Sequence, residues 1–85
     1  MSLTEKQNKY VLRMLAIRHQ RKFGSGTDEE MRALYDASYD IATKNFGATM
    51  RTLILNLENL EKIQKKGLAP RVKELLVDLK QDYEF

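Results

Sequence analysis

Hydrophobic residues recur along the chain at steps of three and four, the spacing that places them on one face of an α-helix. Four segments show this pattern, over about residues 4–22, 28–46, 48–66 and 70–83. No stretch alternates hydrophobic and polar residues with a period of two, so no β-strand is predicted. Short loops between helices favour antiparallel neighbours. The pattern predicts an all-α fold, a compact four-helix up-down bundle formed by a single domain over residues 1–85.

Local signals place the ends of these helices. Thr4 and Thr27 are expected as N-caps, each with a Gln or Glu three residues later that completes a capping box. Gly47 is expected to close the second helix in the left-handed conformation, and Gly67 the third. Pro70 fits the first turn of the fourth helix, where its missing N–H is not needed.

The third helix carries apolar residues on more than one side. Met50, Leu53 and Leu57 share one stripe, whereas Ile54 and Leu55 lie elsewhere around the helix. Such a helix is either central in the bundle or part of a dimer interface. Because a chain of 85 residues has little other surface with which to cover it, a homodimer is one of the two expectations.

The composition excludes several classes of function. Without cysteine the chain has no disulfide, thiolate metal site or thiol nucleophile, and this suits a reducing compartment. His19 is the only histidine, and we find no nucleophile–base pair, metal-ligand spacing or cofactor loop. We therefore expect no catalytic residue, no metal and no cofactor, and a protein that is not an enzyme.

No targeting or membrane signal is evident in the sequence. The N-terminus lacks the apolar region of a signal peptide. The longest unbroken apolar run, residues 14–17, is far shorter than the ~20 residues that span a bilayer. We expect a cytoplasmic protein with no membrane partner.

Charge is distributed unevenly along the chain. The formal net charge of +3 divides into +5 over residues 1–22, −4 over residues 23–42 and +2 over residues 43–85. Two interpretations are open. The basic first helix and the acidic second helix neutralise each other, or the basic face and end of the first helix stay free for phosphate or an acidic partner. Arg18 falls within the apolar arc of its helix, so it either extends past the edge of the core or reaches an acid on the second helix.

Two further patterns in the sequence have structural and functional interpretations. Glu29, Asp36 and Asp40 form an acidic stripe on the second helix, for which solvation or pairing with a basic helix is favoured over cation binding. The segment around Gly47 is similar to a helix-turn-helix, with polar residues from Arg51 onward as a recognition helix. Ile54 and Leu55 interrupt that polar face and favour packing instead.

These observations favour a small protein-binding module. We expect a regulator, inhibitor or assembly subunit, of the kind that phages, plasmids and bacteria encode, acting through its helical faces. The alternative is a nucleic-acid-associated protein that uses the basic face and end of the first helix. An exposed Tyr39 is typical of an interface anchor. The candidate partner-binding residues are Lys9, Arg13, Arg18, Arg21, Lys22, Tyr39, Ile54 and Leu55.

Overall fold

The computed structural model describes residues 3–20 and 26–84, and these fold into four helices. They are α1 (Glu5–His19), α2 (Asp28–Asp40), α3 (Phe46–Ile63) and α4 (Pro70–Tyr83). The described residues contain no β-strand. The expected all-α four-helix fold is therefore confirmed.

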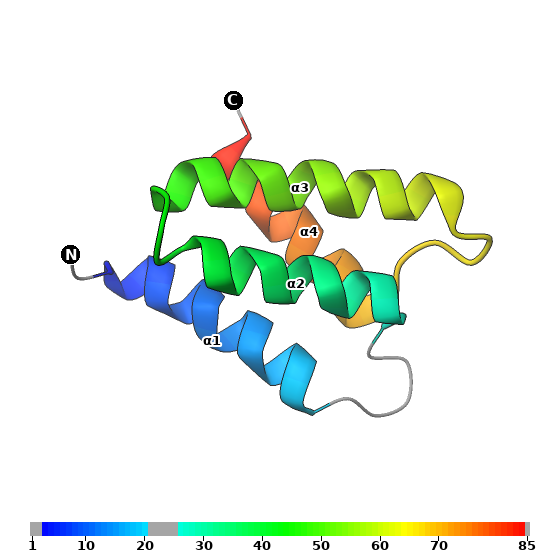
Figure 1. The fold of residues 1–85 in the computed structure, drawn as a ribbon. Coiled ribbons are helices and arrows are strands. Elements are labelled where there is room, and N and C mark those ends of the chain that lie inside the picture. The colour runs from blue at the N-terminus through cyan, green and yellow to red at the C-terminus, as the bar shows by residue number, and fades with distance from the viewer. Residues whose placement is uncertain (1–2, 21–25, 85) are drawn as a thin grey trace.

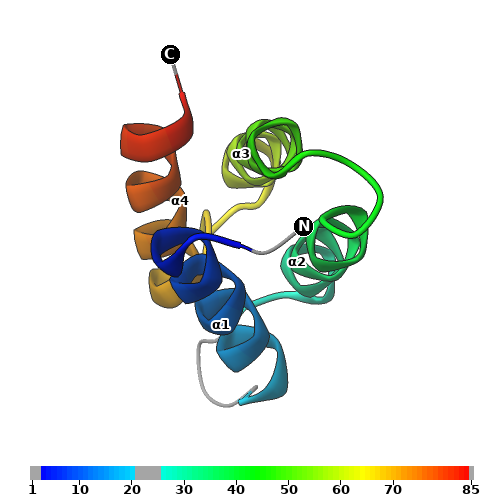
Figure 2. The same ribbon diagram turned by 90° about the vertical axis from the view of Figure 1, so that its left-hand side faces the viewer.

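The helices surround a common core in the order in which they occur along the chain. Both α2 and α4 contact α1 and α3, and α2 and α3 lie side by side along most of their length (Figures 1 and 2). Each helix contributes the side chains of one stripe to the core. Most of these side chains are exposed to solvent over only a few per cent of their surface. The core consists of Tyr10, Met14, Ile17, Ala33, Leu34, Ala37, Phe46, Met50, Leu53, Ile54, Leu57, Leu68, Val72, Leu75, Leu76 and Leu79.

The expected capping boxes are present at the starts of α1 and α2. The backbone N–H groups of Gln7 and Glu30 donate to the hydroxyls of Thr4 (3.1 Å) and Thr27 (3.2 Å), and both return bonds are formed. Pro70 occupies the first turn of α4 as expected. These local signals fix where three of the four helices begin.

The expected end of the second helix is wrong. α2 ends at Asp40, whose carbonyl accepts hydrogen bonds from the N–H groups of Thr43 (2.9 Å) and Lys44 (2.8 Å) in a turn. Asn45 then caps α3, because its side chain accepts from the N–H of Ala48 at 2.7 Å. Gly47 is consequently a helical residue of α3 and is not in the left-handed conformation. Asn45 and Gly47, on either side of Phe46, fit a helix C-terminus as well as a helix start, and the structure uses Asn45 as an N-cap.

The other helix ends differ from expectation by smaller amounts. α1 ends at His19, and α3 runs from Phe46 to Ile63 instead of from 48 to 66. Gly67 does adopt a left-handed φ of 69°, but it lies in the turn after the Gln64 cap and does not follow the last helical turn directly.

Candidate functional site

Two basic residues of α1, Lys6 and Arg13, pair with acids on α4, whereas one interpretation of the charge pattern expected pairing with α2. Lys6 Nζ lies 2.9 Å from Asp82 Oδ1, and an Arg13 nitrogen lies 2.9 Å from Asp78 Oδ2. The Tyr10 hydroxyl donates to Asp82 and contacts the Asp78 carbonyl at 3.1 Å. Much of the positive charge of α1 is therefore neutralised within the molecule.

These contacts shift the protonation equilibria along the α1–α4 seam. The hydrogen bond from Tyr10, and then that from Lys6, lowers the pKa of the Asp82 carboxyl. The hydrogen bond to Asp82 raises the pKa of Lys6. Burial, reinforced by the bond to Asp82, raises the pKa of the Tyr10 hydroxyl. The seam therefore extends the range over which Asp82 is charged to lower pH and the range over which Tyr10 is neutral to higher pH.

Arg18 contacts α2 through an aromatic ring, not through an acid. Its guanidinium carbon lies 4.6 Å from the centroid of the Tyr35 ring, within the range of a cation–π interaction. The two side chains line a hollow of about 300 Å³ together with His19, Asp28, Met31 and Arg32. This contact anchors Arg18 across the edge of the core and turns Tyr35 toward α1.

The remaining candidates from the sequence occupy different environments. Lys9 is exposed and has no ion-pair partner among the described residues. Tyr39 and Leu55 are exposed over 68% and 67% of their surfaces, whereas Ile54 is 2% exposed and belongs to the core. Arg21 and Lys22 lie outside the described residues. The structure thus does not gather the candidates into one surface.

A more uniform surface lies on the solvent side of α3. Its exposed residues, with the two lysines that follow the helix, include four cations and no acid. The two acids of α3 are turned toward α4, where Glu58 lies 3.1 Å from Lys80 and Glu61 lies 3.6 Å from Lys73. We call this surface the α3 outer face; it consists of Arg51, Thr52, Leu55, Asn56, Asn59, Lys62, Ile63, Lys65 and Lys66.

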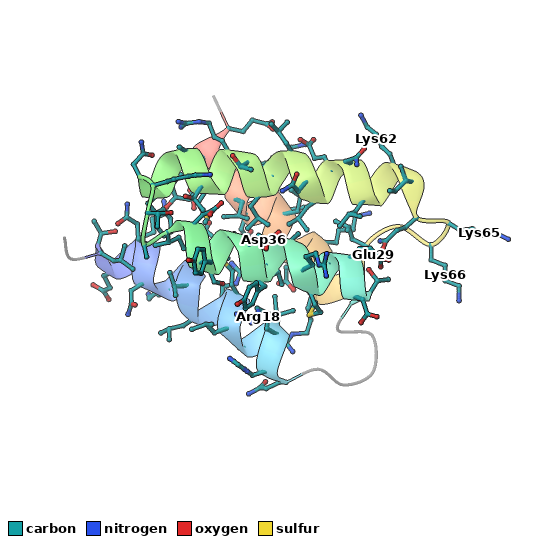
Figure 3. The ribbon with its side chains drawn as sticks, viewed as in Figure 1. Arg18, Glu29, Asp36, Lys62, Lys65 and Lys66 are labelled. Carbon is teal, nitrogen blue, oxygen red and sulfur yellow. The ribbon has the colours of Figure 1, made fainter. Side chains whose placement is uncertain are left out.

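The cations of the α3 outer face have no acid within ion-pair distance among the described residues. Figure 3 shows Lys62 on the last turn of α3, and Lys65 and Lys66 in the segment that follows. At the other end of the face, Arg51 and Leu55 border a hollow of about 150 Å³ that Glu84 also lines. The excess of positive charge is therefore greatest at the C-terminal end of α3.

Two acids on α2 lie beside this face. At 100° per residue, Glu29 and Asp36 are within about 20° of each other, and both are roughly 100–120° around the helix from Tyr35. Because Tyr35 contacts α1, the two acids lie on the flank of α2 that is turned toward α3. Glu29 is at the same end of the bundle as Lys65 and Lys66 (Figure 3). Both acids are exposed and without a described partner, and we call them the α2 acidic row.

The third acid of the predicted stripe behaves differently. Asp40 pairs with Lys44 at 3.3 Å, one helical turn further along the chain. Arg32 also lies on the exposed side of α2, but it lines the hollow next to α1 with Arg18 and Tyr35. Around the helix, Arg32 lies between Tyr35 and the α2 acidic row, about 40° from Asp36 and about 60° from Tyr35.

Sequence reasoning missed the α3 outer face. Nothing in the sequence indicates that Glu58 and Glu61 point toward α4. The helical spacing of Arg51, Leu55, Glu58 and Lys62 places an acid on the same side of the helix as the two cations, so the spacing alone gives no signal for a face without acids.

The described residues offer few sites for other chemistry. Within residues 3–20 and 26–84 there is no group of three or more His, Cys, Asp or Glu side chains that could hold a metal ion. No helix in the same ranges has both the length and the apolar character needed to cross a bilayer. The helix-turn-helix interpretation is not supported, because α2 and α3 run alongside each other instead of crossing steeply (Figure 1). Comparison of the chain with protein-family models, with curated proteins and with solved structures gives no significant match.

Proposed function

We propose that this protein is a non-enzymatic protein-binding module, a regulator, inhibitor or assembly subunit, that docks through the α3 outer face and the adjoining α2 acidic row. The observation that carries the proposal is the charge segregation of this surface. Lys62, Lys65 and Lys66 have no acid partner among the described residues, and Glu29 and Asp36 on the neighbouring α2 have no basic partner. A cytoplasmic location, which the absence of cysteine suits, is part of the proposal.

The apolar side chains on this surface favour a protein over a nucleic acid. Leu55 and Ile63 are exposed over 67% and 68% of their surfaces, in the middle and at the end of the α3 outer face. Full burial of such a side chain is worth about 1.5–3 kcal/mol, and a phosphate backbone offers no apolar surface for it. A protein with an apolar centre and charged rim provides that surface.

The acids on α2 also disfavour the binding of a nucleic acid, which is a polyanion. A duplex lying along the α3 outer face brings its phosphates close to Glu29 and Asp36, and like charges at short range are destabilising. The nucleic-acid alternative drawn from the sequence used α1. That alternative has less support because Lys6 and Arg13 are paired with α4 and Arg18 lies on Tyr35.

Site-specific photo-crosslinking tests the proposal. A benzophenone amino acid replaces Asn59, at the centre of the α3 outer face, and in a matched control it replaces the exposed Glu74 on α4. In cells that encode the chain, we expect protein adducts from position 59 and none above background from position 74. An absence of adducts from position 59 contradicts the proposal.

A binding assay distinguishes the nucleic-acid alternative. Labelled duplex and single-stranded DNA are titrated with the protein at about 50 mM salt, where phosphate contacts are strongest. We expect no saturable binding. Binding that weakens steeply with salt and is lost in Lys62→Glu would replace the proposal with a nucleic-acid function for the same face.

A further inference from the structure

The charged rows on α2 and α3 are complementary to each other. Lys65 and Lys66, at the C-terminal end of the α3 outer face, lie at the same end of the bundle as Glu29 of the α2 acidic row, whereas Lys62 points away from α2 (Figure 3). We propose that the partner docked on this surface is a second copy of the same chain, related to the first by a two-fold axis. This inference rests on the proposed function, since it names the occupant of the same surface.

The arrangement of the helices allows the two rows to meet. A two-fold axis that runs parallel to α2 and α3, between them, places α3 of each copy over α2 of the other. Rotation about such an axis does not change position along it. The end that carries Lys62, Lys65 and Lys66 therefore stays level with the end that carries Glu29 (Figure 3). Both contacts are equivalent, as a two-fold interface requires.

Other self-contacts of this surface are electrostatically unfavourable. Packing α3 against α3 brings the unpaired Lys62, Lys65 and Lys66 of the two copies together, and packing α2 against α2 does the same for Glu29 and Asp36. Like-charge juxtaposition suppresses such arrangements. Only the crossed arrangement, α3 on α2 in both contacts, pairs opposite charges.

The surface is large enough for a dimer of ordinary size. An 18-residue helix such as α3 is about 27 Å long, and two packed helices are roughly 20 Å wide. A standard interface buries about 800 Å² on each partner, which is about one seventh of the 5886 Å² accessible surface of this chain. Ile63, two-thirds exposed, lies on the flank of α3 away from the Lys80–Glu58 and Lys73–Glu61 pairs and becomes covered.

The oligomeric state gives the first test. Light scattering coupled to gel filtration is expected to return about twice the chain mass of 9.9 kDa at high protein concentration and low salt. Because the pairs are exposed, the dissociation constant is expected to increase as salt rises. A mass that stays at 9.9 kDa at millimolar concentration would overturn the inference.

Charge reversal gives the decisive test. One variant carries Lys65→Glu and Lys66→Glu, and the other carries Glu29→Lys and Asp36→Lys. Each variant alone opposes like charges in both contacts, so we expect its self-association to weaken by more than about tenfold. An equimolar mixture pairs opposite charges in both contacts, and we expect it to form a heterodimer. Circular dichroism checks that each variant is folded, since all four positions are exposed.

A control variant with the same net charge distinguishes an effect at the interface from an effect of net charge. Lys9→Glu with Arg71→Glu changes the formal net charge from +3 to −1, as the Lys65 and Lys66 reversal does, but on α1 and α4. We expect this control to dimerise like the unmodified chain. A dimer that survives both interface reversals, or a mixture that does not associate, refutes the crossed arrangement. A monomer that still yields adducts from position 59 to another protein refutes the inference but leaves the proposed function standing, whereas no adducts at all refute both.

Discussion

The carboxyl group of Glu30 joins the start of α2 to the loop before α4, and we expect its removal to destabilise the protein strongly. Glu30 is 1% exposed. Its carboxyl oxygens accept hydrogen bonds from the N–H groups of Thr27 at 2.8 Å and Ala69 at 2.9 Å, and from the Gln64 amide at 3.5 Å. Gln64 in turn accepts from the Thr27 hydroxyl at 2.7 Å and donates to the Gly67 carbonyl at 3.0 Å.

The structure sets the size of the expected effect. Glu30→Ala removes two short hydrogen bonds, worth about 1 kcal/mol each, and leaves the N–H of Ala69 without its acceptor. It also empties the volume of a buried side chain, which adds a cavity cost. We expect the free energy of unfolding to decrease by about 2–4 kcal/mol. For a domain of this size that corresponds to a melting temperature lower by roughly 10–25 °C.

Chemical and thermal denaturation followed by circular dichroism measure this change. The matched control is Glu5→Ala, which also removes an acid from the first turn of a helix but from an exposed position with no described partner. We expect the control to stay within about 0.5 kcal/mol of the unmodified protein. In a double-mutant cycle, Glu30→Ala and Gln64→Ala should be non-additive because they share one network. If Glu30→Ala lowers the free energy of unfolding no more than Glu5→Ala does, the hydrogen bonds of Glu30 do not hold the loop before α4 in place.

Three further predictions follow from particular contacts. The pKa of Asp82 is lowered in the folded protein, so this carboxylate stabilises the fold above its unfolded pKa of about 3.9. Stability should decrease as the pH falls from there through the folded pKa, and Asp82→Asn should flatten the acid side of the plot of melting temperature against pH. Gly26→Ala should cost about 1–2 kcal/mol in urea denaturation, since φ is 138° and the added Cβ would lie 2.6 Å from the Met31 methyl carbon; an unchanged midpoint would contradict this. Ile54→Ala should cost about 2–5 kcal/mol and Leu55→Ala less than about 0.5 kcal/mol at concentrations where the chain is monomeric; equal costs would show that the two neighbouring residues are not core and surface as the structure places them.

Helix starts were more predictable from the sequence than helix ends. Thr4 and Thr27 each bind N–H groups three residues away, so the information for these caps lies within one turn of chain. The boundary between α2 and α3 was mistaken, because Asn45 and Gly47 fit both the end of one helix and the start of the next. Phe46 at the start of α3 is buried against Tyr83 at the end of α4, and their ring centroids lie 5.6 Å apart. This contact between residues far apart in the sequence favours the observed boundary.

The candidate site was less predictable than the fold. The sequence indicated that α1 is basic and α2 acidic, but the acids that pair with Lys6 and Arg13 come from α4, more than sixty residues away. A helical pattern gives the angle of each side chain around its own axis and does not say which helix that side chain meets. For the same reason the sequence did not indicate the α3 outer face. Its excess of positive charge arises only because Glu58 and Glu61 turn toward α4.

The sequence by itself determined the number of helices, the starts of α1, α2 and α4 and the stripe of each helix that enters the core, because hydrophobic spacing and capping are local properties. Only the tertiary structure decided which charges are neutralised. Ion pairing depends on the distances between side chains of different helices, and these are set by how the helices pack around the core. The formal net charge of +3 is therefore less informative than its placement: paired along α1 and α4, and unpaired in two opposite rows on α2 and α3.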